Sequence, residues 1–289
     1  PEFAEMQVAV LRDNVDEDIS PAFVIPTNVP EHRLVPAERQ ITVHDILTHT
    51  SGIASGGLGS AISADAIMWL DTRTSLATNV PKYGDIVLDF QPGDRWRYSA
   101  ATALDVIARI IEIESGYSFD EFVQRRIFEP LGMNDTWWNV PEEYQDRLID
   151  IVDSDAATPP NSAIYDTSHS TYFGASYGLK STAGDYLRFE QMLVNGGELF
   201  GNRLLKPQTV ELMSSNQVGD LFNAMPGVSD QGFGYTVATT QESNERRSKG
   251  AFGWGGALGT RSWSDPAQEL TGVIMIQQPV PAVQNDFEN

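Results

Sequence analysis

The pentapeptide Gly174-Ala-Ser-Tyr-Gly178 has the Gly-x-Ser-x-Gly spacing that presents a nucleophilic serine in many hydrolases. In those enzymes the serine stands on a sharp turn between a strand and a helix, and an acid and then a histidine follow it along the chain. Here all four histidines precede Ser176; they are His32, His44, His49 and His169. The surrounding pattern also lacks the strand-helix alternation of such folds. The sequence therefore predicts that Ser176 lies in a backbone loop and is not a nucleophile.

His44 and His49 are the two histidines with a spacing that could suggest a metal site. Five residues on a helix correspond to about 140° of rotation, so the two rings would not share a face. No acidic residue stands at the spacing of a zinc-binding helix, and the absence of cysteine removes thiolate ligands, thiolate nucleophiles and disulfides. We therefore predict no metal here and expect His49 to organise its loop by hydrogen bonding.

Three segments, taken in order and spacing, point to a family. They are Ile41-Thr-Val-His-Asp-Ile-Leu-Thr-His-Thr-Ser-Gly-Ile53, Gln91-Pro-Gly-Asp-Arg-Trp-Arg-Tyr-Ser-Ala100 and Gly253-Trp-Gly-Gly-Ala-Leu-Gly-Thr260. Together they resemble the serine β-lactamase and penicillin-binding-protein superfamily, in particular its class C β-lactamase and family VIII carboxylesterase branch. Matches at residues 127–136, 178–186 and 196–213 extend the resemblance over nearly the whole chain. It implies an α+β fold of the β-lactamase/transpeptidase type, in which an antiparallel sheet is flanked by helices beside a mostly helical region.

That superfamily depends on a Ser-x-x-Lys motif, which supplies the nucleophile, and this sequence has none. The residues three places before the four lysines are Asn79, Tyr177, Arg203 and Arg246. We therefore interpret the chain as truncated before the motif and incomplete at both ends, without the N-terminal strands and the C-terminal helix of the family. The 289-residue chain alone is expected to be inactive, and its last strand is expected to present an unpaired apolar edge that favours self-association.

Tyr98 is the first candidate catalytic residue. Tyr98-Ser99-Ala100 stands at the superfamily's Tyr-x-Asn motif, with Ala100 in place of the asparagine. A tyrosine in water has a pKa of about 10, too high for a base at neutral pH, but a neighbouring lysine ammonium favours the phenolate. The resemblance implies that Tyr98 takes the proton of the missing serine, with Ser99 as its motif neighbour. On spacing alone, Tyr98 could equally cap the following helix or pack in the core.

Trp254, Gly255, Gly256 and Ala257 match the position of the superfamily's Lys-Thr-Gly strand. Glycines there let a substrate lie against the backbone, and the resemblance implies that the Ala257 N–H is one oxyanion-hole donor. Penicillin-recognising members have a lysine at the place of Trp254, whose charge faces the substrate carboxylate. Tryptophan cannot supply that charge, so the departure favours the carboxylesterases. Without the resemblance, the same residues could be a glycine-rich strand entry or bulge.

Composition limits the partners. The apolar content of 41% fits a folded globular protein, and no apolar run approaches the roughly 18 residues of a membrane span. The net charge of −21 repels phosphate and so argues against nucleic acid and anionic membranes. The implied partner is a small-molecule ester or amide substrate, with no cofactor. The oligomeric state and the compartment stay open, although the resemblance favours a periplasmic or secreted protein.

The hydrophobic pattern predicts a single domain over residues 1–289, mostly helical at 41–230 and with antiparallel strands at 231–278. We expect strands at residues 232–239, 258–264 and 270–277, with a turn at 265–268, and irregular chain at 12–40. We expect helices at 42–48, at 99–115, from 118 to a point before Pro130, after a Thr182 cap, and from Pro207.

Three functions stay open at this point. The leading hypothesis is a serine hydrolase that acts on esters through an acyl-enzyme. The second is a β-lactamase or D-amino peptidase, against which Trp254 and Ala100 argue. The third is a catalytically dead homologue that acts as a binding module, which requires that the gene itself lacks Ser-x-x-Lys.

Overall fold

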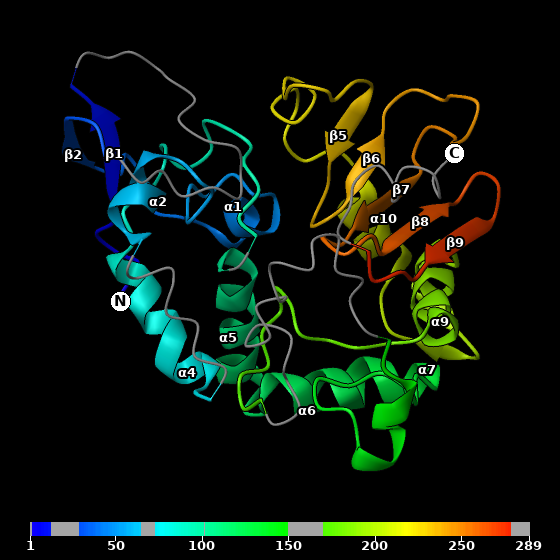
Figure 1. The fold of residues 1–289 in the computed structure, drawn as a ribbon. Helices are drawn as coiled ribbons and strands as arrows, with labels where there is room; N and C mark the ends of the chain where they lie inside the picture. Colours follow the sequence, from blue (N-terminus) through cyan, green and yellow to red (C-terminus); the bar gives the residue numbers. More distant parts are fainter. Residues whose placement is uncertain (1, 13–28, 65–72, 101, 150–169, 279–289) are drawn as a thin grey trace. The chain divides into compact units, whose positions relative to one another are not determined.

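The computed structural model describes residues 2–12, 29–64, 73–100, 102–149 and 170–278 (Figure 1). The chain divides into two compact units, of which the first comprises Pro1–Phe122 with Thr171–Tyr177 and the second comprises Val123–Ser170 with Gly178–Asn289. Helices and antiparallel sheets make up the fold, which is the α+β class that the sequence predicts. None of the helices in the described part of the chain is long and apolar enough to cross a membrane.

The first unit begins with a two-stranded antiparallel sheet of β1 (Gln7–Leu11) and β2 (His32–Pro36). The backbone at Leu88 continues this sheet, because its N–H donates to Gln7 O at 2.8 Å and its carbonyl accepts from Ala9 N at 3.0 Å. The prediction of irregular chain at residues 12–40 is therefore wrong for β2. Strand β2 is stabilised by pairing with β1, which is distant in the sequence, and local composition does not reveal such pairing.

Helical elements of the first unit precede and follow the candidate tyrosine segment along the chain. They are α1 (Val43–Leu47), α2 (Leu58–Ile62), α4 (Leu76–Asn79), the 3-10 turn η1 (Val80–Asp85) and α5 (Ala103–Ser115). Gly116, at φ 74°, ends α5 as predicted. The predicted start at Ser99 is wrong, because the helix begins at Ala103 after Thr102 as N-cap.

A continuous helical run crosses from the first unit to the second. It consists of α6 (Phe119–Val123), the π turn η2 (Gln124–Phe128) and α7 (Glu129–Leu131). The run does not stop before Pro130 as predicted, but continues to Leu131 and ends at Gly132, at φ 66°. A proline has no N–H to donate to the carbonyl four residues back and its ring crowds that carbonyl. The wider π turn just before it accommodates both effects.

The second unit is built on a five-stranded antiparallel sheet in which each strand pairs with the next along the chain. Its strands are β5 (Gln231–Phe233), β6 (Ala238–Thr240), β7 (Phe252–Gly255), β8 (Arg261–Asp265) and β9 (Leu270–Ile274). Helix α9 (Ala183–Val194), capped by Thr182 as predicted, packs against β8 and β9. There the Ser264 hydroxyl donates to the buried Glu190 carboxylate at 2.7 Å. Within the described residues, β9 pairs only with β8 and so forms one edge of the sheet.

Two short strands and a helix lie between α9 and this sheet along the chain. They are β3 (Glu198–Leu199), β4 (Asn202–Arg203) and α10 (Pro207–Ser214), which starts at Pro207 as predicted. The 3-10 turn η3 (Glu142–Arg147) precedes α9. The predicted turn at residues 265–268 is confirmed, since Gln268 N donates to Asp265 O at 3.2 Å.

All three predicted strands have different bounds in the structure, and the last, expected at residues 270–277, ends at Ile274. Residues 232–239 form two strands, because the chain turns back where Gly234 N donates to Val237 O at 2.8 Å and Thr236 adopts φ 66°. The strand expected from Leu258 starts at Arg261, because Leu258 lies in a turn closed by the hydrogen bond from Gly256 N to Thr260 O at 2.7 Å.

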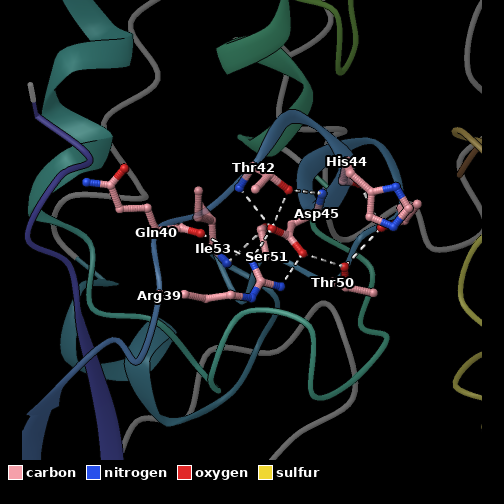
Figure 2. Close-up of polar contacts among 9 residues, drawn as sticks. Arg39, Gln40, Thr42, His44, Asp45, Thr50, Ser51 and Ile53 are labelled. Carbon is pink, nitrogen blue, oxygen red and sulfur yellow. Dashed lines mark hydrogen bonds and ion pairs between the residues drawn. The ribbon is translucent and has the colours of Figure 1, made fainter.

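A buried carboxylate organises the start of α1 (Figure 2). Asp45 is 2% exposed and completes a capping box with Thr42, whose N–H and hydroxyl donate to Asp45 Oδ2 at 2.8 and 2.6 Å. The Arg39 guanidinium binds the same carboxylate with two hydrogen bonds, of 2.6 and 2.7 Å. Thr50 Oγ1 donates to Asp45 Oδ1 at 3.3 Å. The predicted N-cap is confirmed, and this one side chain joins three segments of the chain.

We predict that Asp45→Asn lowers the free energy of unfolding at pH 7 by about 1.5–3 kcal/mol, the scale of hydrogen bonds to a charged group. Burial raises the pKa of Asp45, but the hydrogen bonds from Arg39 and Thr42 outweigh it and hold the pKa at about 2, below the ordinary 3.8. As the pH falls, Asp45 is therefore protonated in the unfolded chain before it is protonated in the folded protein. The stabilisation by the Asp45 carboxylate is present above about pH 4 and is lost as the pH falls toward 2. Urea unfolding at several pH values should show the two proteins converging over this range.

The matched control for this measurement is Glu31→Gln. Glu31 also binds an arginine, Arg12 at 2.8 Å, but both side chains are exposed, at 80% and 66%. Its loss should change stability by less than about 1 kcal/mol. A difference between wild type and Asp45→Asn that stays constant from pH 5 to pH 2 would contradict the assignment.

Candidate active site

Two segments of the first unit lie together and carry the candidate tyrosine. Backbone hydrogen bonds join them at three points, from Asp89 N to Gly52 O at 2.9 Å, from Gly93 N to Thr50 O at 2.8 Å and from Arg97 N to His49 O at 3.0 Å. Gly52 adopts φ 76°, and a Cβ there would lie 2.7 Å from the carbonyl oxygen of Phe90. Only glycine fits so close an approach, so this position holds the two segments in register.

Tyr98 lies at the end of this paired region, half-buried against His49. The two ring centroids are 4.8 Å apart with the planes at 65°, an edge-to-face arrangement. The next residue, Ser99, is 2% exposed and its N–H donates to His49 Nδ1 at 3.3 Å. His49 therefore binds the amides of both Arg97 and Ser99. Helix α5 starts four residues later than predicted, after Thr102 as its N-cap.

His49 is the residue on which this arrangement depends. Its side chain is 2% exposed, and burial lowers its pKa to about 4, so that it is neutral at pH 7. Its ring also meets Trp96 edge-on, with centroids 6.0 Å apart. The expectation that His49 organises a loop by hydrogen bonding is confirmed.

The Ser176 segment is a loop, as predicted. Residues 170–178 form neither strand nor helix, so the serine does not stand on a turn between a strand and a helix. Ser176 N instead donates at 3.0 Å to the carboxylate of Asp105, which also accepts from the Tyr172 hydroxyl at 2.5 Å. His169 lies outside the described residues.

Asp105 is a polar residue that the sequence analysis missed. It is 0% exposed on the first turn of α5, and burial raises its pKa. The hydroxyls of Tyr172 and Tyr83 lie 3.1 Å apart beside it, so the carboxylate and two phenols form a buried network. The sequence did contain a signal for this network, because Asp105 is an acidic residue beside the apolar face of the helix predicted at residues 99–115. Its hydrogen bonds fix the 172–176 loop to the helix that follows Tyr98.

In the second unit, β7 carries the tryptophan-glycine segment. The Trp254 ring meets the fully buried Phe233 ring at 89°, with centroids 5.4 Å apart. A Cβ at Gly253 would lie 2.1 Å from the carbonyl oxygen of Ser262, and one at Gly255 would lie 2.3 Å from Arg261 Nη1. The backbone of the neighbouring strand β8 therefore requires glycine at position 253, whereas at position 255 the close neighbour is the Arg261 side chain.

Gly256 differs from these two glycines. A Cβ there would have its nearest neighbour, Thr260 Cβ, at 3.5 Å, an ordinary contact, and its φ lies outside the left-handed region. The fold of the second unit does not require glycine at this position. Space beside the backbone of Gly256 is what a substrate lying against the strand would use.

Arg261, which the sequence analysis also missed, holds the turn that follows β7. Its Nη1 donates to the carbonyl oxygens of Gly256 and Thr260, each at 3.0 Å. Together with the backbone bonds across residues 256–260, this fixes the peptide between Gly256 and Ala257, whose N–H is the candidate oxyanion donor.

The predicted site residues thus form two groups. Tyr98 and Ser99 lie together with His49 in the first unit, and Trp254 to Ala257 are consecutive in the second. Among the described residues, no cluster of three or more histidine or acidic side chains could hold a metal ion.

The profile of the family described as Beta-lactamase matches residues 8–289. The chain belongs to this family. Protein Rv1367c of Mycobacterium tuberculosis is 31% identical to this β-lactamase-family chain over 262 residues, which are 86% of the chain and 65% of that protein. The lovastatin esterase of Penicillium rubens is 28% identical over 271 residues, which are 85% of the chain and 66% of the esterase. The chain therefore spans slightly less than two thirds of the length of these relatives.

Solved structures agree on the fold. Unliganded simvastatin synthase (LovD) from Aspergillus terreus superposes with a TM-score of 0.72 at 20% identity, over 99% of this chain and 72% of the synthase. The α+β fold of the β-lactamase family, expected from the sequence motifs, is confirmed.

We predict different outcomes for alanine substitutions at Gly253, on β7, and at Gly256, which directly follows β7. Gly253→Ala should lower the free energy of unfolding by about 1–3 kcal/mol, because its methyl group would overlap the backbone of β8. Gly256→Ala should leave it unchanged or raise it by up to about 1 kcal/mol, because the site has room and alanine restricts the unfolded chain. Denaturant unfolding of both variants measures the difference. Equal destabilisation would show that Gly256 is also required by the fold.

Proposed function

We propose that the protein to which these residues belong is a serine hydrolase that cleaves carboxylic esters through an acyl-enzyme. The observation that carries the proposal is the fixed, half-buried Tyr98, held against the neutral His49 by the Ser99 amide bond and the ring contact. A general base must have one defined position relative to the group from which it takes a proton. The membership of the β-lactamase family and the similarity to a lovastatin esterase support the same reaction class.

In the proposed reaction the nucleophile is the serine of a Ser-x-x-Lys motif outside these 289 residues. Tyr98, beside the lysine of that motif, takes the serine proton while the serine oxygen attacks the ester carbonyl. The carbon-oxygen bond to the alcohol then breaks, and the proton goes to the departing alcohol. Water hydrolyses the acyl-enzyme in the second half of the cycle, with Tyr98 again accepting and returning a proton.

The second group of residues would bind the substrate. The Ala257 N–H is proposed as one donor to the carbonyl oxygen as it becomes negative, and the Arg261 hydrogen bonds on either side of it preorganise the turn. Gly256, beside which there is room, would let the acyl group lie along the backbone. Trp254 packs on Phe233 and offers an apolar surface instead of a positive charge, which favours neutral esters over β-lactam carboxylates.

The first test compares the complete gene product with the 289-residue chain. The complete protein should hydrolyse short p-nitrophenyl esters and not a chromogenic cephalosporin, and the chain alone should show no turnover above background. Ser176→Ala in the complete protein should leave ester turnover unchanged. Turnover by the 289-residue chain that disappears with Ser176→Ala would contradict the proposal, and a gene without Ser-x-x-Lys and without turnover would favour a binding module.

The second test is Tyr98→Phe in the complete protein. Loss of a general base should lower kcat by roughly 10²–10⁴-fold. Thermal unfolding should change little, because only one hydroxyl is lost and the ring contact with His49 remains. A Tyr98→Phe variant with full activity would show that the tyrosine is structural.

A further inference from the structure

His49 adopts a backbone conformation that is rare for its residue type. Its φ is 56°, in the left-handed region that favours glycine, and a non-glycine residue remains there only when its surroundings hold it. The surroundings here are specific: His49 O accepts from Arg97 N at 3.0 Å, and its ring lies between the rings of Trp96 and Tyr98. In this conformation the imidazole contacts the Tyr98 ring and accepts a hydrogen bond from Ser99 N.

The hydrogen bond to Ser99 defines the protonation of the ring. A backbone amide can only donate, so His49 Nδ1 must be the unprotonated acceptor and the ring proton must lie on Nε2. Its burial keeps the ring neutral at pH 7. Of the tautomers and charge states of histidine, one alone fits this site.

This hydrogen bond and the ring contact act on consecutive residues. The amide of Ser99 fixes the peptide that carries the Tyr98 carbonyl, and the imidazole edge limits rotation of the Tyr98 ring. Neither contact involves the tyrosine hydroxyl, so His49 can orient the phenol without competing for its proton.

We infer that His49 is a positioning residue for the general base, which sets the direction of the Tyr98 hydroxyl through the Ser99 amide and the ring contact. The inference rests on the proposed function, in which Tyr98 is that base. It predicts an effect on kcat rather than on substrate binding, because misplacing a base slows the chemical step and leaves ground-state contacts unchanged.

The experiment uses two variants of the complete gene product with p-nitrophenyl ester as substrate. His49→Phe keeps a ring between Trp96 and Tyr98 but removes the acceptor, and it should lower kcat by about 10–100-fold with KM changed less than about threefold. His49→Asn keeps an acceptor, its Oδ1, and tolerates the left-handed backbone, so it should recover most of kcat. The double variant His49→Phe/Tyr98→Phe should be no slower than Tyr98→Phe alone, since an absent base cannot be misplaced.

A measurement on the wild type covers the case in which His49→Phe does not fold. In protein labelled with ¹⁵N-histidine, two-bond ¹H–¹⁵N spectra at pH 7 should show His49 with an unprotonated Nδ1 and a protonated Nε2. The opposite tautomer would overturn the inference, as would full kcat in His49→Phe or losses that add in the double variant.

The two proposals fail in different ways. A complete wild-type protein that shows no ester turnover would count against the proposed function, and the role of His49 in catalysis would fall with it. An active wild type whose kcat does not respond to His49→Phe would overturn the positioning role alone.

Discussion

The position of the Tyr98 segment depends on the hydrogen bonds of the buried Asp45 carboxylate. Removing a charge from water is costly unless it is paired and hydrogen-bonded, and Asp45 is satisfied by Arg39, by the cap residue Thr42 and by Thr50. Arg39 and the N-cap Thr42 precede α1, and Thr50 follows it. One side chain therefore fixes both the start of the helix and the path of the loop that leaves it.

The path of that loop determines where His49 lies. Thr50 N donates to Asp45 O at 2.8 Å and Thr50 O accepts from Gly93 N at 2.8 Å, so the residue next to His49 is held on both sides. With its neighbour fixed, His49 adopts its left-handed conformation and receives the amides of Arg97 and Ser99. The Asp45 carboxylate thus fixes the backbone at Thr50, this backbone fixes the His49 imidazole, and the imidazole contacts the Tyr98 ring.

In the second unit, close strand packing and the Arg261 side chain fix the backbone around the tryptophan-glycine segment. There Gly253 allows the β8 backbone to approach closely, and the Arg261 side chain occupies the space above Gly255 while it binds the turn at residues 256–260. A positive group thus lies beside the tryptophan-glycine segment although position 254 is not a lysine. Its guanidinium donates to the backbone carbonyl oxygens of Gly256 and Thr260.

Local sequence determined the elements whose causes are local. The cap of Thr42 with Asp45, the cap at Thr182, the stop at Gly116 and the proline that opens α10 depend on residues within one turn of each other, and all were predicted correctly. The motifs around Tyr98 and Trp254 likewise identified the family, because order and spacing along the chain are sequence properties.

Only the tertiary structure decided the features that depend on distant partners. The β2 strand exists because β1 pairs with it, and the Ser99 amide, at the predicted start of a helix that in fact begins at Ala103, donates to His49 some fifty residues earlier. The helical run passes Pro130 because a π turn forms before it. The roles of Asp105 and Arg261 were equally hidden, since each depends on carbonyls, amides or phenols that the fold brings to it. Hydrogen bonds act over a few ångströms in space, and the sequence states only which groups are present, not which of them will meet.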